Sequence, residues 1–220
     1  MSETTIETVP YVAREEILVG PKTQLQGTTF IHDSVRYALQ VKQFGLADWL
    51  AYIAWVGMMM GLLGGTSGFI LIGWYHGVKF PEYVWNVPIG IAIFVGAISF
   101  DTIGHRTAYK EALKKGEALV HHITIFAGVT SCVLLGLAYS HPVFLRFPAW
   151  AFTILSVFYA VIDESMHWFR FHQGNSDRVE MWSHFFIFLG HLVFILPWVY
   201  WFEMGYPGVA ETVPYLPHLF

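Results

Sequence analysis

The chain has little charge and almost no cysteine. Only 13% of its 220 residues are charged, whereas 55% are hydrophobic. The single cysteine, Cys132, excludes a disulfide or a thiolate cluster within one chain, and we expect it to be a small buried hydrophobic residue. The net charge of −4 provides no basic surface for nucleic acid, which we do not expect as a partner. The N-terminus is polar and acidic and does not resemble a secretory signal, so the first spanning helix should direct insertion.

The sequence does contain long apolar segments. Five of them approach or exceed the roughly 20 residues needed to cross a bilayer, at 49–75, 84–105, 118–140, 147–171 and 181–202. We therefore predict an all-α integral membrane protein with about five transmembrane helices. Residues 1–47 should form a cytoplasmic or interfacial segment, with a surface helix near 31–44. Residues 48–203 should form the transmembrane domain and residues 204–220 a C-terminal tail.

The lysines and arginines are distributed unevenly between the two predicted sides of the membrane. All of them except Lys79 and Arg146 fall on the side that holds the N-terminus. Because lysine and arginine in short loops favour the cytoplasm, we predict that this side faces the cytoplasm.

A carboxylate followed four residues later by a histidine occurs four times, always at that same predicted end of a helix. In a helix, residues at i and i+4 lie on one face, so each pair can direct an oxygen and a nitrogen to one point. The sequence therefore predicts that helices two to five form a four-helix bundle around a metal site near the cytoplasmic surface. The pairs are Asp101/His105, Glu117/His121, Asp163/His167 and Glu180/His184.

Three more residues belong to the candidate metal ligands, namely His122, Glu164 and His191. Adjacent His121 and His122 diverge by about 100° around a helix, so each could serve a different metal, or one could support a ligand. Glu164 is either a ligand or a hydrogen-bond partner of the nearby histidine. Glu117 and Glu180 begin their helices, where capping is the alternative to ligation.

Imidazoles and carboxylates without thiolates favour iron, manganese, zinc or divalent copper. The number of candidate ligands exceeds the needs of one ion, so we predict two metal ions, with iron preferred and copper or zinc as alternatives. Haem is less favoured, because haem ligation does not explain a carboxylate one turn before each histidine.

Equal spacings suggest that one helical hairpin is repeated: Asp101/His105/His122 matches Asp163/His167/His184. In this region, VIDESMHWFRF followed by WSHFFIFLGH resembles the metal-binding region of the C subunit of the particulate methane and ammonia monooxygenases. In that family an acidic or amide residue, a histidine four positions later and a further histidine come from successive membrane helices. The resemblance implies that these six residues are ligands in a copper monooxygenase-like subunit. The predicted cytoplasmic site is similar instead to membrane di-iron desaturases and hydroxylases, although their HxxxH and HxxHH boxes are absent.

The function we predict is hydroxylation or desaturation of a lipophilic substrate by an oxygen-activating dinuclear centre. An external electron donor is expected, since the chain has no flavin, nicotinamide or iron–sulfur motif. The alternatives are a copper monooxygenase-like subunit, a zinc-dependent lipid hydrolase, a b-type haem electron-transfer subunit and a metal-ion carrier. Besides membrane lipids, we expect a second protomer or subunit as a partner for the first helix, through Gly57, Gly61 and Gly65.

Overall fold

A computed structural model describes residues 29–107, 115–174 and 176–216 of the protein. All regular structure in these ranges is helical, and five helices are long and apolar enough to cross a membrane. This confirms the predicted all-helical class and the five spans. The long helices are α2 (Leu46–Tyr75), α3 (Asn86–Arg106), α4 (Lys115–Ala138), α5 (Pro142–His172) and α6 (Arg178–Glu203). The short ones are α1 (Phe30–Ala38), η2 (Leu39–Gln43), η3 (Glu82–Trp85), α7 (Val209–Thr212) and η4 (Val213–Tyr215).

Local polar groups determine where several helices begin. The Asp177 side chain accepts a hydrogen bond from the Glu180 backbone at 2.8 Å and so caps α6. At the start of α2, the Asp48 carboxylate accepts a bond from the Gly45 backbone at 3.2 Å. Pro142 begins α5, at a position where the absence of a backbone N–H has no cost. The span predicted from 147 therefore begins earlier than its apolar run.

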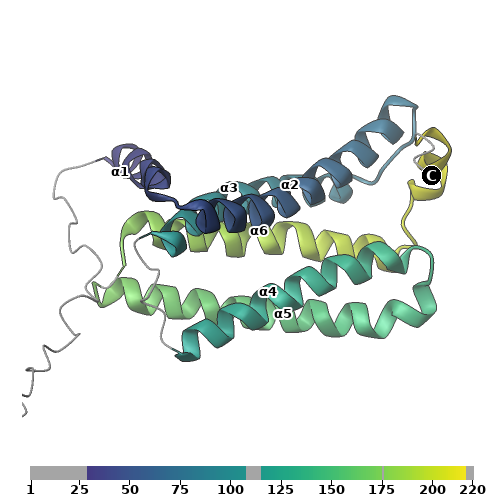
Figure 1. Ribbon diagram of the computed structural model, residues 1–220. Helices are drawn as coiled ribbons and strands as arrows, with labels where there is room; N and C mark the ends of the chain where they lie inside the picture. The colour runs from purple at the N-terminus through teal and green to yellow at the C-terminus, as the bar shows by residue number, and fades with distance from the viewer. Residues whose placement is uncertain (1–28, 108–114, 175, 217–220) are drawn as a thin grey trace, which may run out of the picture.

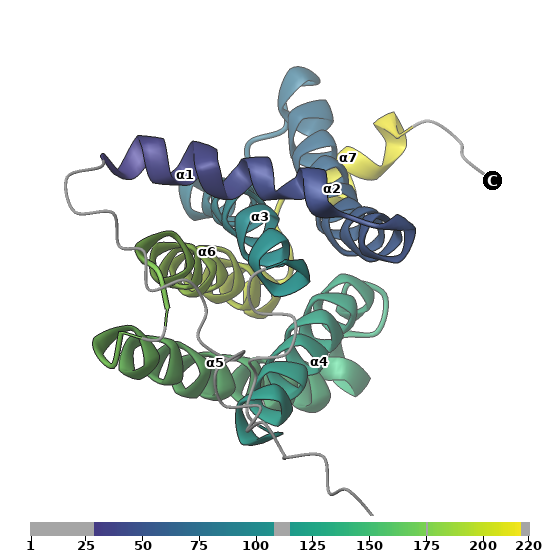
Figure 2. The ribbon, with the colours of Figure 1, turned by 60° about the vertical axis from the view of Figure 1, so that its left-hand side comes forward.

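The five long helices pack in layers. Helices α3 and α6 form one close pair, α4 and α5 form another, and α2 packs on α3 (Figure 1). Seen from the turned direction, α3 and α6 lie between α2 on one side and the α4/α5 pair on the other (Figure 2). Successive long helices are antiparallel, so α3 and α5 end at the same end of the bundle where α4 and α6 begin. We call this the polar end.

Apolar packing is concentrated away from the polar end. The largest fully buried apolar side chains include Ile70 late in α2, Ile91 early in α3 and Ile195 late in α6. Beyond α6, Tyr206 is buried and donates a hydrogen bond to the Leu135 carbonyl. Burial raises the pKa of this phenol, so the hydroxyl keeps its proton and remains a donor.

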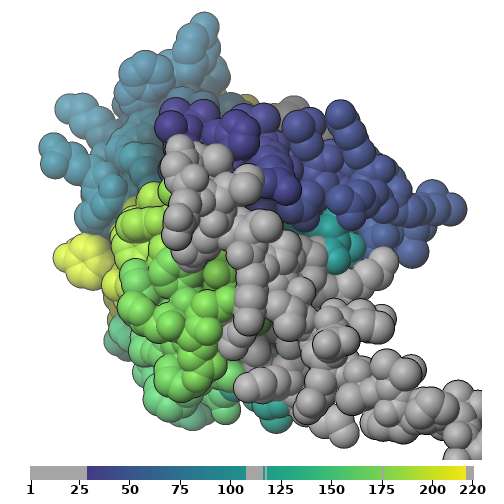
Figure 3. All heavy atoms as spheres, turned by 90° about the vertical axis from the view of Figure 1, so that its left-hand side faces the viewer, coloured from purple at the N-terminus to yellow at the C-terminus, as the bar shows by residue number. Residues whose placement is uncertain are grey.

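Helix α1 is anchored to the polar end of the bundle, as the predicted surface helix would require. Tyr37 is buried against Ile103 of α3 and Val179 of α6. The Asp33 carboxylate accepts a bond from Arg178 Nε at 2.6 Å, which ties α1 to the start of α6. Figure 3 looks onto this end, with the purple α1 lying across the green segment that contains the end of α5 and the start of α6. The opposite face of α1 exposes apolar side chains, including Ile31 at 75%, a pattern suited to a membrane surface.

Close packing between helices of this chain depends on Gly90 and Gly190, and not on the regularly spaced glycines of α2. A Cβ atom built on Gly57, Gly61 or Gly65 would meet nothing within 4 Å in the described chain. At the α3/α6 contact, by contrast, a Cβ on Gly90 would lie 2.8 Å from the Gly190 carbonyl oxygen. One on Gly190 would lie 2.7 Å from the Phe94 backbone nitrogen. The backbones of α3 and α6 therefore touch because both residues are glycine.

Candidate metal centre

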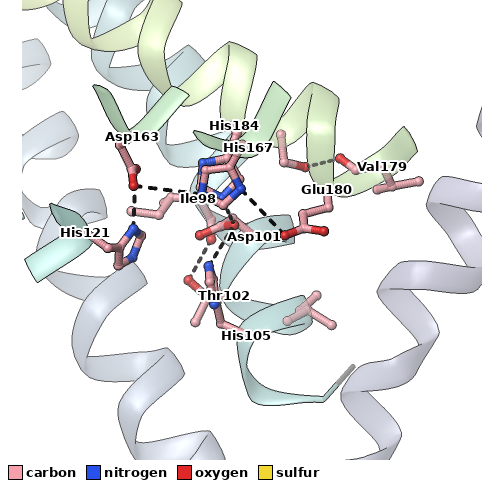
Figure 4. A network of polar contacts seen from close by, with 12 residues as sticks. Ile98, Asp101, Thr102, His105, His121, Asp163, His167, Val179, Glu180 and His184 are labelled. Carbon is pink, nitrogen blue, oxygen red and sulfur yellow. Dashed lines mark hydrogen bonds and ion pairs between the residues drawn. The ribbon is translucent and has the colours of Figure 1, made fainter. Parts of the chain in front are cut away.

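The polar end gathers carboxylates and histidines from four helices into a buried cluster. Asp101 and His105 come from the last turns of α3, and Asp163 and His167 from the corresponding part of α5. His121 comes from the start of α4 and His184 from the start of α6. Figure 4 shows these side chains turned toward one another. The antiparallel connection of the helices places them at one depth.

One group of three is centred on Asp101. Its Oδ1 atom lies 2.8 Å from Nε2 of His184 and 3.4 Å from Nε2 of His105 (Figure 4). Asp101 and His184 are 4% and 3% exposed, and the His105 side chain is 17% exposed. Donor atoms that share one ion at about 2.0–2.2 Å lie about 3 Å apart. Both separations from the Asp101 oxygen are close to this value, as a metal ion held by two histidines and one carboxylate requires.

A second group of three is centred on Asp163. Its Oδ2 atom lies 3.4 Å from Nδ1 of His121, and its Oδ1 atom lies 3.9 Å from Nε2 of His167. The ligand atoms of these residues lie within 4.8 Å of one another, although the Asp163–His167 separation must shorten for shared coordination. This group again has one carboxylate between two histidines. We refer to the two groups as the Asp101 triad and the Asp163 triad.

The two triads are immediate neighbours. The rings of His167 and His184 stack with centroids 3.2 Å apart, and the His105 and His121 centroids are 5.2 Å apart. His121 also falls within 4.8 Å of Asp101 and His105, so the ligand sets overlap in space. We assign His121 to the Asp163 triad because its hydrogen-bond contact is with Asp163.

Several ligand atoms of the triads are buried and have ion-pair contacts within the triads but no hydrogen bond of standard geometry to any described residue. Within the described chain, this holds for Oδ1 of both aspartates and for Nε2 of His105, His167 and His184. Leaving a buried polar group without a partner costs about 1–3 kcal/mol, and more for a charged group. Coordination of metal ions would satisfy these five atoms together, whereas Thr153 Oγ1 and Glu180 Oε2, which also lack a hydrogen bond in the ranges that the structure describes, lie outside the triads. These buried, mutually facing atoms are the observation that favours a metal centre over separate helix-end ion pairs.

Glu180 and Arg170 lie behind the Asp163 triad. Arg170 Nη2 donates to Oε1 of the fully buried Glu180 and to Nδ1 of His167, the latter at 2.9 Å. His167, Glu180 and His184 also form a possible ligand group, but the guanidinium makes that position unfavourable for a cation. Because Nδ1 of His167 accepts from Arg170, a neutral His167 carries its proton on Nε2, and coordination through Nε2 requires the Arg170 contact to give way. Glu180 offsets the positive charge of Arg170 beside the Asp163 triad.

This role predicts a partial effect for Glu180→Gln. Without the Glu180 charge, the Arg170 guanidinium beside the Asp163 triad is no longer offset, so the affinity of this triad for iron should fall about 10–100-fold, the usual effect of losing a partner outside the ligand shell. Competition with a chelator measures the change. Glu164→Gln is the matched control, because Glu164 accepts a 2.6 Å bond from Trp168 Nε1 and glutamine can still accept it. Unchanged affinity in Glu180→Gln would contradict the assignment.

The structure does not bring every predicted ligand into the triads. His122 is exposed and its Nδ1 contacts the Ala118 carbonyl oxygen at 2.6 Å, whereas its neighbour His121 points inward. Glu164 bonds to Trp168, and His191 lies deeper along α6 with Nε2 3.4 Å from Ser156 Oγ. The side chain of Glu117 lies outside the described part of the structure. Glu180 lies in the first turn of α6, where the helix dipole favours a carboxylate as the alternative to ligation requires, although Asp177 supplies the side-chain cap.

Arg170 is the residue that the sequence-based prediction of the site overlooked. It was counted only as a basic residue near a helix end, although it follows His167 by three positions and therefore shares a helix face with it. A histidine and an arginine spaced in this way, followed by a buried glutamate, were the signal that could have identified it.

No protein-family model matches this chain, and no curated protein or solved structure matches it. Function must therefore be inferred from the residues and geometry of the site. The resemblance to the C subunit of the copper monooxygenases remains limited to the motif. The structure uses His121 in α4, where that motif alignment selected His122.

Proposed function

We propose that this protein is a membrane-bound oxidase of C–H bonds whose two triads hold a pair of iron ions. The observation that supports this most directly is the repeated pattern of two histidines and one aspartate, with buried ligand atoms that have no other hydrogen bond. A facial set of two histidines and one carboxylate is typical of non-haem iron(II) oxygenases, because it leaves coordination positions open. Two such sets in contact are suited to a pair of metal ions.

When bound, the irons would supply the redox chemistry for reduction of dioxygen. In hydroxylation, one oxygen atom enters a C–H bond and the other leaves as water, which consumes two electrons and two protons from an external donor. In desaturation, the substrate supplies two hydrogens and the external donor again supplies two electrons with two protons, so that both oxygen atoms leave as water. The carboxylates of Asp101 and Asp163 offset the positive charge of the metal ions, and the surrounding helices exclude bulk water.

Several features of the chain support a cytoplasmic reductant and a lipophilic substrate. The exposed surfaces of the spanning helices are apolar, so the substrate can be dissolved in the membrane. The predicted cytoplasmic orientation of the polar end would place the triads within reach of a soluble or membrane-bound electron donor. We propose that the metal centre lies near the cytoplasmic face of an integral membrane protein.

The test is iron analysis combined with oxygen consumption. Protein purified anaerobically should contain about two irons per chain, the number expected for two separate sets of ligands. After chemical reduction it should consume dioxygen, whereas the oxidised protein without a donor should not. Zinc at one ion per chain with no oxygen reactivity would refute the proposal, and copper in both triads would favour the copper monooxygenase-like alternative.

A further inference from the structure

A cavity of about 300 Å³ extends from the triads into the apolar part of the bundle. Asp101, His121, Asp163 and His184 lie at its polar end. Most of the remaining lining is apolar, as at Ile98, Phe94 and Phe194. The two triads therefore border a compartment large enough for a small molecule, rather than a fully packed core.

Helix α2 forms one wall of this cavity. The residues that line it from α2 are Trp55, Met58, Met59 and Leu62, whereas sequence patterns predict only a packing role for this helix. The helix packs on α3 and has no extended interface with α4, which lines another wall. Figure 2 shows α2 and α4 on the same side of α6, one above the other at the right of the view. The wall between α2 and α4 is therefore completed by side chains rather than by helix contact.

The cavity reaches the lipid-facing surface between these two helices. Met58 of α2 is 45% exposed and Val133 of α4 is 54% exposed, and both residues line the cavity. Both belong to spanning segments, so the opening they flank lies at the depth of the hydrocarbon. An apolar molecule in the bilayer could enter there without crossing water.

We propose that this cavity is the substrate chamber, that it opens laterally to the bilayer between α2 and α4, and that its occupant is a small apolar alkyl compound. The proposal rests on the proposed function, which places a reactive centre at the polar end of the chamber. Binding there would bring a C–H bond to the triads while the rest of the molecule contacts the apolar wall.

The volume of the chamber and the absence of basic residues in its described lining favour a small alkyl compound over a membrane phospholipid. The volume is at the lower limit of the range of about 300–1,000 Å³ for small-molecule sites. No lysine or arginine occurs among the described residues that line the chamber, so nothing there pairs with a phosphate headgroup. The polar groups near the apolar region, Glu164 and His191, are already in contact with Trp168 and Ser156.

Photolabelling tests the chamber without requiring activity. The full chain in lipid nanodiscs is exposed to an octane analogue that carries a diazirine, and labelled residues are located by mass spectrometry. Ile98 and Phe194 are buried chamber residues that lipid does not reach, whereas Phe126 and Leu137 of α4 face outward. Unlabelled octane at ten times its dissociation constant should reduce labelling of the first two about tenfold, by mass action. Labelling of the outward residues should not change.

A pair of glycines in α4 provides matched variants. A Cβ on Gly128, which lines the chamber, meets nothing within 4 Å, so Gly128→Phe can fill the space without a backbone clash. Gly136 is equally unobstructed but is exposed on the same helix and does not line the chamber. Gly128→Phe should abolish the octane-sensitive labelling of Ile98 and Phe194 and leave the iron content unchanged. Gly136→Phe should behave as the wild type.

Two outcomes would overturn the inference. One is labelling of Ile98 and Phe194 that octane does not reduce in the wild type, which needs no variant to fold. The other is efficient labelling of these residues by a phospholipid with a diazirine on its acyl chain, without displacement by octane, which would make the occupant a membrane lipid. Because labelling is measured without metal or oxygen, these results are separate from those of the iron analysis. A chain that lacks iron but shows octane-sensitive labelling would refute only the proposed chemistry.

Discussion

Asp101→Ala should reduce the iron content from about two ions per chain to about one, and Asp163→Ala should do the same. Each aspartate is the only carboxylate of its triad, and it contributes both a coordinate bond and the charge that offsets the metal ion. The double variant should bind no iron and consume no dioxygen. Iron analysis after anaerobic purification measures the effect, with circular dichroism to verify that the helices are retained.

Adjacent histidines in α4 provide the control for this experiment. His121→Ala removes a ligand of the Asp163 triad and should lower the iron content, whereas His122→Ala removes an exposed ring and should not. Both variants replace a histidine of α4 by alanine, at adjacent positions. A lower iron content in His121→Ala alone would therefore reflect the position of that histidine and not the loss of a histidine in general. If Asp101→Ala and Asp163→Ala both retained two irons, the triads would not be the metal sites.

Gly190→Ala should separate α3 from α6 and release iron from the Asp101 triad in preference to the Asp163 triad. The added methyl group would lie 2.7 Å from the Phe94 nitrogen, so one helix backbone must move. Overpacking of this kind costs about 1–3 kcal/mol of folding stability. Helices α3 and α6 supply all three ligands of the Asp101 triad, whereas the ligands of the Asp163 triad come from α4 and α5.

Two measurements test this prediction. Thermal unfolding in detergent should show the loss of stability, and iron analysis should show a decrease toward one ion per chain. Gly61→Ala is the matched control, since its new methyl group meets no atom of the described chain within 4 Å. If Gly190→Ala and Gly61→Ala had equal stability and iron content, the close contact of α3 and α6 would not determine the geometry of the site.

The residue pattern was sufficient to predict which helices carry the cluster and at which end. Hydrophobic runs longer than a bilayer thickness indicate spans regardless of how they pack, and the i, i+4 spacing places a carboxylate and a histidine on one face. Alternating helix directions then bring the ends of the first and third of the four helices together with the beginnings of the second and fourth. For these reasons Asp101, His105, Asp163, His167 and His184 were predicted correctly as neighbours in space.

The choice between His121 and His122 depended on the rotation of α4 about its own axis. The equal residue spacing in the two hairpins predicts that His122 is the ligand. The structure turns His121 inward instead, because the rotation of α4 about its axis is set by its packing on α5 and not by the number of residues in a loop. The same reason applies to the glycines. The stripe at four-residue intervals in α2 predicts contact with a second protomer or subunit and stays a prediction, whereas the glycines that meet within the chain are Gly90 and Gly190, far apart in the sequence.

The sequence by itself determined the helical class, the five spans and the supply of imidazole and carboxylate ligands at one end, because these follow from composition and helical period. Only the tertiary structure decided how the candidate ligands divide into two triads, that Arg170 and Glu180 lie behind one of them, and that α2 borders the cavity. These features depend on distances between segments that are remote in the chain. Local patterns determine the face of a helix on which a side chain lies, whereas its partner is determined by the packing of the whole bundle.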